Sequence, residues 1–566
     1  MTGDRHPALL AVWSVVIVVC LTWGIGSYPL IDQDEGRNGE VAREMAATND
    51  YILPHLNGLP YIDKPVLSFA ATAAAMELLG PTELAARLVP LLCSLATALL
   101  IGWFAGRWYG RESGWIAGIV AITAPLPLAF SRVVILDSLL ALLVTASLVA
   151  FDTAIERRVV GREDRLWNVL AWAAIGLGIL TKGPVALALP LMVAAPYAVW
   201  RRASWAVWNP IGPVVAAALV APWVGFMEAR LPGYLRYVAI TETWQRVSSD
   251  ELQRSQPWWY LLAVAAVGFF PWWLLVLGRR GSRAASDPRR IFGWLWLGVP
   301  LVFFSLSRSK MPQYILPLMP SIALLVASRW RDPRRTVRLG AWLAVAGWSA
   351  VGAAMLAVGV GAIDTSGVNS AVAAALPVPC QVMAVVCLAA VVVGAASIRS
   401  GDSRALVIAL GLPVVAIPVV LAPAISALAE NRSERALVRL IQTELPAETE
   451  VLGLEAWRPS LAFYLRRPVP IASRDGDELR SNFIVRTADR WLRDGGVLRP
   501  VPDPPTSVAR CDQPTVVLVH VRRPDLQTML ADSGLERIWV GPKLAAYVCD
   551  PAATVEDAAT DATGGK

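Results

Sequence analysis

Residues 31–45 read Ile-Asp-Gln-Asp-Glu-Gly-Arg-Asn-Gly-Glu-Val-Ala-Arg-Glu-Met and lie between the first two hydrophobic segments of the chain. The polar interval continues to Tyr61-Ile-Asp-Lys-Pro65. It gathers the following ionisable side chains into about one loop: Asp32, Asp34, Glu35, Arg37, Glu40, Arg43, Glu44, Asp63 and Lys64. Ionisable groups beside lipid are costly, and in membrane proteins they mark functional sites. We therefore expect this polar interval, residues 31–65, to carry chemistry.

The composition is that of a polytopic membrane protein. Of the 566 residues, 55% are hydrophobic and 17% are charged, whereas soluble domains carry about 25% charged residues. The mean hydropathy is +0.51. The net charge of +7 comes from basic residues in short loops between apolar runs, as the positive-inside rule predicts. This distribution argues against nucleic-acid binding.

Apolar runs of spanning length recur along the first three quarters of the chain. They cover residues 8–28, 84–105, 114–130, 133–152, 166–182, 183–200, 208–227, 258–278, 291–306, 312–329, 337–359, 378–398 and 404–428. A span needs about 20 residues, so we predict about 13 transmembrane helices. The first run is long for a signal-peptide core and lacks a clear cleavage site, so we expect a retained helix.

Charge asymmetry predicts the topology. Basic residues concentrate in one alternating set of loops, at 107–111, 157–165, 201–202, 279–290, 329–338 and 399–404. Placing this set in the cytoplasm puts the polar interval outside, together with the tail from about residue 430. The run 66–80 has only about 15 apolar residues and cannot cross without breaking this alternation. We expect it to form a re-entrant or interfacial helix.

Two outer loops and the tail complete the expected organisation. The membrane domain covers residues 1–429, with long outer loops at 30–65 and 228–257. The second loop is rich in Trp and Tyr, which suits either an interfacial anchor or a substrate-facing surface. Strand-like runs at 451–454, 516–521 and 545–548 alternate with helix-like runs at 434–445, 484–493 and 524–531. This pattern predicts a small extracytoplasmic α/β domain over 430–555, with a disordered tail at 556–566.

The six cysteines fall into two groups. Four lie inside apolar segments and are expected to be packing residues: Cys20, Cys93, Cys380 and Cys387. Cys511 and Cys549 lie in the polar tail, where they can pair if the tail is outside the cytoplasm. The sequence alone does not show whether they form a disulfide.

Asp34 and Glu35 follow directly after the first helix. A carboxylate there can serve as a general base or hold a metal. An alternative is structural, with Asp34 capping a helix over 35–47 and Glu35 in its first turn. Composition leaves both readings open. Asp32-Gln33-Asp34 also matches the weak D-x-D pattern of metal-dependent nucleotide-sugar enzymes, but no nucleotide-binding domain surrounds it.

Further ionisable residues lie at the outer ends of later spans. Asp137 begins an otherwise apolar span, and an acid in that position is a candidate functional group, although a structural ion pair with Arg132 or with a neighbouring helix is an alternative. The expected topology also places these cations at the outer face: Lys64, Arg132, Lys182, Arg308 and Lys310. Each alone suits headgroup anchoring. Together with carboxylates, they suit a ligand that carries a phosphate at the membrane surface.

The order of short motifs along the chain adds a specific resemblance. The motifs are Asp34-Glu35, Arg43-Glu44-Met45, Leu56-Asn57-Gly58, Asp63-Lys64-Pro65, Ala85-Ala86-Arg87-Leu88, Arg132 with Leu136-Asp137, Leu180-Thr181-Lys182-Gly183-Pro184, Ser309-Lys310-Met311-Pro312 and Tyr314-Ile315-Leu316-Pro317. This order resembles the bacterial aminoarabinose transferase and protein mannosyltransferase-like group of integral-membrane glycosyltransferases. The resemblance implies the GT-C fold.

The resemblance also implies roles for matched positions. Asp34 corresponds to the outer-loop acid proposed as the catalytic base, with Glu35 beside it, and Asp137 corresponds to a second acid. The positions expected to bind the donor are Asp63, Lys64, Lys182 and Tyr314, with Arg132 and Lys310 as helpers. Three departures, at Asn38, Asp63 and Val66, leave the acceptor and any bound metal open.

The resemblance therefore implies an inverting glycosyltransferase that uses a polyprenyl-phosphate-linked hexose or pentose, with undecaprenyl phosphate as the expected carrier. The acceptor would be a lipid, glycan or protein at the outer face of the bacterial cytoplasmic membrane. No nucleotide or other cofactor is required by the sequence, and a divalent metal is left open. The alternative from another class is a transporter or flippase of lipid-linked sugars, but no clear internal repeat is present.

Overall fold

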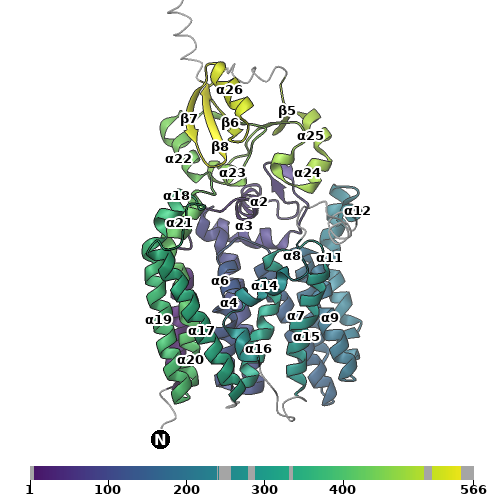
Figure 1. The fold of residues 1–566 in the computed structure, drawn as a ribbon. Helices are drawn as coiled ribbons and strands as arrows, with labels where there is room; N and C mark the ends of the chain where they lie inside the picture. The colour runs from purple at the N-terminus through teal and green to yellow at the C-terminus, as the bar shows by residue number, and fades with distance from the viewer. Residues whose placement is uncertain are drawn as a thin grey trace, which may run out of the picture. The chain divides into compact units, whose positions relative to one another are not determined.

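The computed structural model describes residues 6–238, 240, 256–277, 287–330, 335–502 and 513–549. Its internal contacts divide the chain into two compact units (Figure 1). The first unit consists of Met1–Ser27, Lys64–Ala71 and Arg87–Ile425, and the second of Tyr28–Asp63, Thr72–Ala86 and Ser426–Lys566. This division differs from a single boundary at residue 429, because most of the polar interval groups with the C-terminal part of the chain.

The first unit is a bundle in which helices occupy the apolar runs (Figure 1). Its helices are α1 (His6–Thr22), α4 (Glu83–Tyr109), α5 (Arg111–Ile122), α6 (Pro125–Phe130), α7 (Asp137–Val159), α8 (Arg165–Lys182), α9 (Val185–Trp200), α10 (Trp205–Trp208), α11 (Ile211–Arg230), α12 (Tyr234–Tyr237), α14 (Tyr260–Gly268), η2 (Trp272–Val276), α15 (Pro288–Leu306), η4 (Pro312–Leu318), α16 (Met319–Arg329), α17 (Arg335–Gly359), α18 (Ser370–Ala375), α19 (Pro377–Ser400), α20 (Ser403–Val420) and α21 (Ala422–Glu430). The start of α4, up to Ala86, and the end of α21, from Ser426, belong to the second unit.

The length and apolar composition of several helices are those of membrane-spanning helices. Among the described residues, seven helices are long and apolar enough to cross a membrane. They are Glu83–Tyr109, Asp137–Val159, Trp205–Arg230, Pro288–Leu306, Arg338–Gly359, Pro377–Ser400 and Ser403–Val420. Shorter apolar helices lie at Leu9–Thr22, Leu67–Leu79 and Val185–Trp200. Helix α3 (Leu67–Leu79) has 13 residues, about 20 Å of helix, which is too short to cross a hydrocarbon core of about 30 Å.

Three predicted spans are each built from two pieces. The run 114–130 divides into α5 and α6 before Pro125, and the run 258–278 divides into α14 and η2 at Pro271. The run 312–329 begins as the 3₁₀ helix η4 and continues as α16. Proline has no amide hydrogen to donate and disfavours helix in the preceding residue, so these breaks lie at or near prolines.

Small residues allow close packing of α4 against α5. A Cβ atom on Gly114 would lie 2.6 Å from the carbonyl oxygen of Gly102 and 2.7 Å from the Cα atom of Gly106. Within lipid, helices associate through such close backbone approaches rather than through the hydrophobic effect. The α4–α5 hairpin therefore depends on glycine at this crossing.

The second unit contains the polar interval and the predicted α/β domain. Its elements are α2 (Asp34–Thr48), β1 (His55–Leu56), β2 (Leu59–Pro60), α22 (Arg435–Glu444), β3 (Glu450–Leu454), α23 (Pro459–Leu465), β4 (Ile471–Ser473), η5 (Asp477–Leu479), α24 (Asn482–Arg486), α25 (Ala488–Asp494), β5 (Leu498–Pro500), β6 (Thr515–His520), α26 (Pro524–Asp532), β7 (Glu536–Val540) and β8 (Leu544–Cys549). Helix α3 is shared between the two units.

The tail strands form one mixed six-stranded sheet in the order β5-β4-β3-β6-β8-β7. Strands β5, β4, β3 and β6 are parallel, and β8 is antiparallel to both β6 and β7. Val517, Leu518 and Val519 of β6 are fully buried, as expected for a central strand with both faces covered. The three predicted strands correspond to β3, β6 and β8, while β4, β5 and β7 were not predicted.

The polar interval is joined to the tail by buried hydrogen bonds. The Asn57 side chain donates to the Val469 carbonyl oxygen at 2.8 Å and accepts from the Val469 amide at 2.7 Å. Helix α2 packs against α23, and the phenolic hydroxyl of Tyr464 accepts from the Leu30 amide at 2.9 Å. The interval is therefore part of a folded domain rather than an independent loop.

Several predicted features lie outside the described residues. These are the disordered tail at 556–566, most of the aromatic loop 228–257 including Trp244, and Cys511. Cys549 is disulfide-bonded, whereas Cys20, Cys93, Cys380 and Cys387 are free cysteines in the helical unit.

Candidate functional site

Asp137 and Lys182 form an ion pair in the first unit. Asp137 is the first residue of α7, and Lys182 is the last residue of α8. The ammonium group donates to Asp137 Oδ1, and the two side chains are 6% and 14% exposed. Gly183 ends α8 with a φ of 78°, a left-handed conformation that glycine adopts without steric cost. The turn therefore holds Lys182 at the C-terminal end of α8, where the helix dipole stabilises a cation.

Tyr314 completes this group. It lies on η4, which packs against α7, and its ring centroid is 4.9 Å from Lys182 Nζ. This distance is suitable for a cation–π contact. The structure thus brings together three residues that are up to 177 positions apart in the sequence: Asp137, Lys182 and Tyr314. We call them the lysine triad.

Two other predicted cations of the first unit, Lys310 and Arg132, contact backbone oxygens. Lys310 is buried, donates to the Gln256 carbonyl oxygen at 2.7 Å, and has a pKa that burial lowers. Arg132 is also buried and donates to the carbonyls of Leu21 and Trp23, the latter at 2.8 Å. These bonds satisfy carbonyls at the end of α1, so Arg132 has a structural contact in addition to its predicted role.

Lys64 is half-buried and belongs to the first unit, whereas its neighbour Asp63 belongs to the second. Both oxygens of the Asp63 carboxylate accept backbone hydrogen bonds, from Asn482 at 2.9 Å and Phe483 at 3.1 Å. These amides begin α24, where helix amides lack intrahelical partners. Asp63 thus holds the tail against the polar interval.

Asp34 is an accessible acid of the polar interval. It is the first residue of α2, and Gln33 occupies the cap position without a side-chain capping bond. Asp34 therefore does not cap the helix, contrary to the structural alternative. Its side chain is 44% exposed and ion-paired with the Arg37 guanidinium. An exposed carboxylate with one cationic partner is available to accept a proton from a bound hydroxyl group.

Arg37 links Asp34 to other polar groups and was not predicted as a site residue. Burial alone would lower its pKa, but nearby Tyr61, Asp34 and Asp63 raise the pKa overall. Arg37 Nε is buried and has no hydrogen-bond partner among the described residues. An unpaired donor beside the candidate base is available to a ligand. The helical spacing of Asp34 and Arg37, three residues apart, was the only sequence signal for this pair.

Glu35 has a structural contact of its own. Its side chain is buried, and Oε2 accepts from the Ile31 amide at 2.8 Å. Glu35 therefore fixes the chain that enters α2, although its predicted place beside the base is retained.

Asp32, two residues before the candidate base, belongs to a buried cluster of charged side chains. Asp32 Oδ2 is 3.2 Å from Arg458 Nε and accepts from the Ser460 hydroxyl at 2.6 Å. Glu434 Oε1 lies 3.7 Å from the same Arg458 nitrogen. Burial raises the pKa of Asp32 to about 6, against the opposing effect of Arg458. Burial and the charge of Asp32 raise the pKa of Glu434 to about 7. No local sequence pattern indicates this cluster, because Asp32 lies about 400 residues before Glu434 and Arg458.

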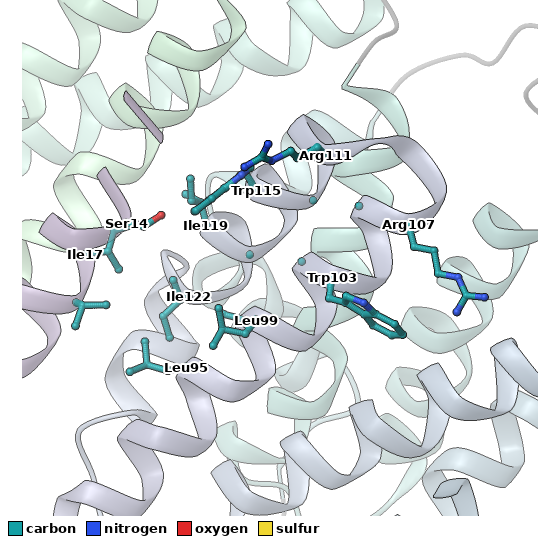
Figure 2. A pocket seen from close by; sticks show the side chains of 16 residues that line it. Ser14, Ile17, Leu95, Leu99, Trp103, Arg107, Arg111, Trp115, Ile119 and Ile122 are labelled. Carbon is teal, nitrogen blue, oxygen red and sulfur yellow. The ribbon is translucent and has the colours of Figure 1, made fainter. Parts of the chain in front are cut away.

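The first unit also contains an apolar groove of about 600 Å³ between α1, α4 and α5 (Figure 2). Leu99, which lines it, is 75% exposed, so hydrocarbon chains of the membrane can reach it. Arg107 and Arg111 lie at the groove with their guanidinium groups pointing in different directions (Figure 2). None of the predicted site residues is among its described lining residues, so this groove is not the predicted site.

The described residues contain no group of three or more His, Cys, Asp or Glu side chains placed to hold a metal ion. In the polar interval, the two candidate ligands have other partners: Asp34 pairs with Arg37, and Glu35 accepts from a backbone amide. Within the described residues, these two carboxylates therefore do not form a cage of ligands for a metal ion.

Comparison with protein families adds an independent finding. The model of the dolichyl-phosphate-mannose-protein mannosyltransferase family matches residues 63–226. This stretch contains Asp63, Lys64, Arg132, Asp137 and Lys182. It does not include Asp34, Glu35, Lys310 or Tyr314.

Curated relatives are similar over a longer stretch. The undecaprenyl phosphate-alpha-4-amino-4-deoxy-L-arabinose arabinosyl transferase of Aeromonas salmonicida is 33% identical over 331 residues, which cover 56% of this chain and 59% of that protein. The enzyme of the same description from Pectobacterium carotovorum is 34% identical over 344 residues, covering 58% and 61%. The chain thus matches about three fifths of the length of these relatives.

The whole fold has a solved counterpart. The crystal structure of ArnT from Cupriavidus metallidurans bound to undecaprenyl phosphate superposes with a TM-score of 0.79 and 25% sequence identity. The superposition covers 97% of this chain and 99% of that chain. It confirms the predicted fold class, a mainly helical GT-C membrane fold with a small C-terminal α/β domain, and the predicted resemblance to the aminoarabinose transferase group.

Proposed function

We propose that this protein is an inverting glycosyltransferase that uses a sugar linked to undecaprenyl phosphate. The observation that carries the proposal is its similarity, over 97% of its length, to ArnT bound to undecaprenyl phosphate. The relatives' names describe transfer of 4-amino-4-deoxy-L-arabinose, so this pentose is the first donor sugar to test. A hexose is second, because the matching family model describes mannosyl transfer. These names favour a transferase over a transporter or flippase.

Asp34 would act as the general base. Its carboxylate takes the proton as the acceptor oxygen attacks the anomeric carbon, and the bond from that carbon to the lipid phosphate breaks with its electron pair on the phosphate. Attack opposite the leaving group inverts the anomeric centre. The ion pair with Arg37 holds the Asp34 carboxylate in position.

The lysine triad would bind the donor phosphate. Asp137 and Tyr314 hold the Lys182 ammonium in place, and an ammonium has three donors, so one pair leaves others for phosphate oxygens. Negative charge on the phosphate grows as the glycosidic bond breaks, and a preorganised cation stabilises that charge. Lys64, Arg132 and Lys310 would add positive charge, and no nucleotide is needed.

The reaction would take place at the outer face of the bacterial cytoplasmic membrane, with a lipid, glycan or protein as acceptor. Alternating loop charge supports this orientation. The disulfide bond at Cys549 supports it independently, because disulfides persist mainly in oxidising compartments outside the cytoplasm.

The test is transfer by the purified protein in nanodiscs. Undecaprenyl phosphate carrying radiolabelled 4-amino-4-deoxy-L-arabinose, mannose or glucose is incubated with membrane extract, and the labelled products are separated by class. We expect one donor to give a labelled acceptor and free undecaprenyl phosphate. Movement of a labelled donor across liposome membranes without formation of a new glycoside would overturn the transferase in favour of a flippase.

A further inference from the structure

The tail sheet has a topological switch point between β3 and β6. Strand β3 is paired with β4 on one side and with β6 on the other, and all three strands are parallel. Their carboxyl ends therefore lie at the same edge of the sheet. In open α/β sheets, ligands bind outside the carboxyl ends of the strands at such a switch point. The side chains at this edge therefore indicate which ligand the sheet could bind.

Three cations at this edge have no partner among the described residues. Arg522 follows β6 by two residues, and its amide donates to His520 Nδ1 at 3.1 Å. Lys543 precedes β8, and its carbonyl oxygen accepts from the Val521 amide at 2.9 Å. Arg480 follows η5, in the chain that leaves β4. Within the described residues, these three side chains make no hydrogen bond or ion pair.

The neighbouring acids are already paired. Glu455, which follows β3, accepts from Arg474 at 2.7 Å and also from Arg523. Asp525 accepts from the same Arg523 at 2.7 Å. These pairs leave Arg480, Arg522 and Lys543 without a neutralising carboxylate.

Three further charged groups of this edge form hydrogen bonds or an ion pair. Glu478 accepts from the Ser473 hydroxyl at 2.6 Å, and Asp475 accepts from the Asp477 amide at 3.0 Å. Arg458, which is buried, is held by Asp32 at 3.2 Å. The two hydrogen bonds do not cancel the charge of these acids, but the charges that act on His520 are those of cations.

His520 reports this positive charge. Burial lowers its pKa, and the surrounding cations Lys543, Arg522, Arg458 and Arg480 lower it further. Its ring is thus mainly neutral near pH 7. Because Nδ1 accepts the Arg522 amide hydrogen, the proton of a neutral ring lies on Nε2, which is then a hydrogen-bond donor. We call Arg480, His520, Arg522 and Lys543 the switch-point cluster.

We propose that the switch-point cluster is a binding site for a phosphate group. Three unpaired cations and a neutral N–H donor, gathered at the carboxyl ends of parallel strands, match the charge and hydrogen-bonding capacity of a phosphate. The site lies in the tail domain and goes beyond the proposed transfer reaction, because its binding requires neither a donor sugar nor turnover. The shared ligand chemistry is a phosphate ester, carried either by a glycan or by a lipid headgroup.

The histidines provide a direct measurement of binding. The chain has only three, His6, His55 and His520, so NMR of the full-length protein with labelled histidine gives three signals. The His520→Asn variant assigns the signal of His520. Glucose 6-phosphate is expected to raise the midpoint of the His520 titration by about one pH unit, because the phosphate counteracts the cations. Glucose is expected to leave the midpoint unchanged.

Variants separate the cluster from general surface charge. The double variant Arg522→Ala/Lys543→Ala should lose the response to glucose 6-phosphate. The matched control is Arg537→Ala on β7, an exposed cation without a partner among the described residues of the tail. This control should respond like the wild type. A wild-type midpoint that no phosphate moves, or a double variant that still responds fully, would overturn the site.

Two further probes distinguish the sources of the phosphate ester. Inorganic phosphate tests the anion alone, and dihexanoyl phosphatidic acid tests a lipid headgroup. A stronger response to the sugar phosphate assigns the site to a glycan phosphate, and a stronger response to the lipid assigns it to a headgroup. Because no transfer is measured, failure of this site and failure of the proposed glycosyltransferase give different results.

Discussion

The ammonium group of Lys182 at the end of α8 is ion-paired with the carboxylate of Asp137 at the start of α7. Both side chains are mostly buried, so removing one partner leaves an uncompensated charge. We expect Asp137→Asn or Lys182→Met alone to destabilise the helical unit by about 3–5 kcal/mol. The double variant should recover most of this loss, as measured by denaturant unfolding in detergent.

Activity separates the structural role of this pair from its role with the donor. The double variant is expected to remain inactive, because it lacks the cation proposed for the donor phosphate. Transfer at the wild-type rate by the stable double variant would remove Lys182 from the site. Arg162→Ala, which removes an exposed cation from another helix connection, is the control and should keep full activity.

Replacing the candidate base should abolish transfer without unfolding the protein. Asp34 is 44% exposed, so Asp34→Asn is expected to change the melting temperature little. Loss of a general base lowers turnover by about 100-fold to 10,000-fold. The measurement is product formation at saturating donor. Asp489→Asn, an exposed acid at the start of α25, is the matched control. Undiminished turnover by Asp34→Asn would contradict the assignment.

The Asp32–Arg458–Glu434 cluster predicts a pH dependence of stability. The pKa values of Asp32 and Glu434 are raised to about 6 and about 7 in the folded protein. A carboxyl group with a raised pKa binds its proton more tightly when folded, so it stabilises the fold at low pH. That contribution is lost as the pH rises through 6 and 7.

The variant Glu434→Gln removes one of these titrations while retaining the shape of the side chain. The decrease in melting temperature between pH 5 and pH 8 should be smaller for this variant than for the wild type. Glu448→Gln, at an exposed acid of the same unit, should follow the wild-type curve. Identical slopes for Glu434→Gln and the wild type would show that Glu434 does not titrate in this range.

Asn57 should contribute to stability rather than to chemistry. Asn57→Ala leaves the buried amide and carbonyl of Val469 without partners, at a cost of about 1–3 kcal/mol for each group. Asn57 also has a φ of 55°, which disfavours alanine. Asn57→Gly removes the same hydrogen bonds without the backbone strain, so it should be less destabilising. Equal stability of Asn57→Ala and the wild type, measured by thermal unfolding, would contradict this role.

Chelation tests the use of a metal. Because cationic side chains can stabilise the departing phosphate, EDTA is expected to leave the rate of sugar transfer unchanged. The experiment compares EDTA-treated protein with the same protein after addition of Mg²⁺, Mn²⁺ or Zn²⁺. A rate that falls with EDTA and returns with one of these ions would assign a metal to the reaction.

Elements with strong local signals could be predicted without a structure. Long apolar runs can satisfy their backbone hydrogen bonds in lipid only as helices, so helices were predicted in the runs that contain α4, α7, α15 and α19. Strand β6, a continuous apolar run, was also predicted because buried parallel strands have this composition. The order of polar motifs was enough to indicate the GT-C fold and the residues of the lysine triad.

Contacts between residues that are distant in the sequence became known only from the tertiary structure. The short strands β4 and β5 each have three residues, too few for a periodic pattern, and form only because the sheet supplies their partners. The Asp32–Arg458 pair and the Asn57–Val469 hydrogen bonds join segments more than 400 residues apart. Pairing of this kind depends on chain topology, which no local pattern encodes. The polar interval was therefore predicted from the sequence to be functional, and its place within the tail domain became known only from the fold.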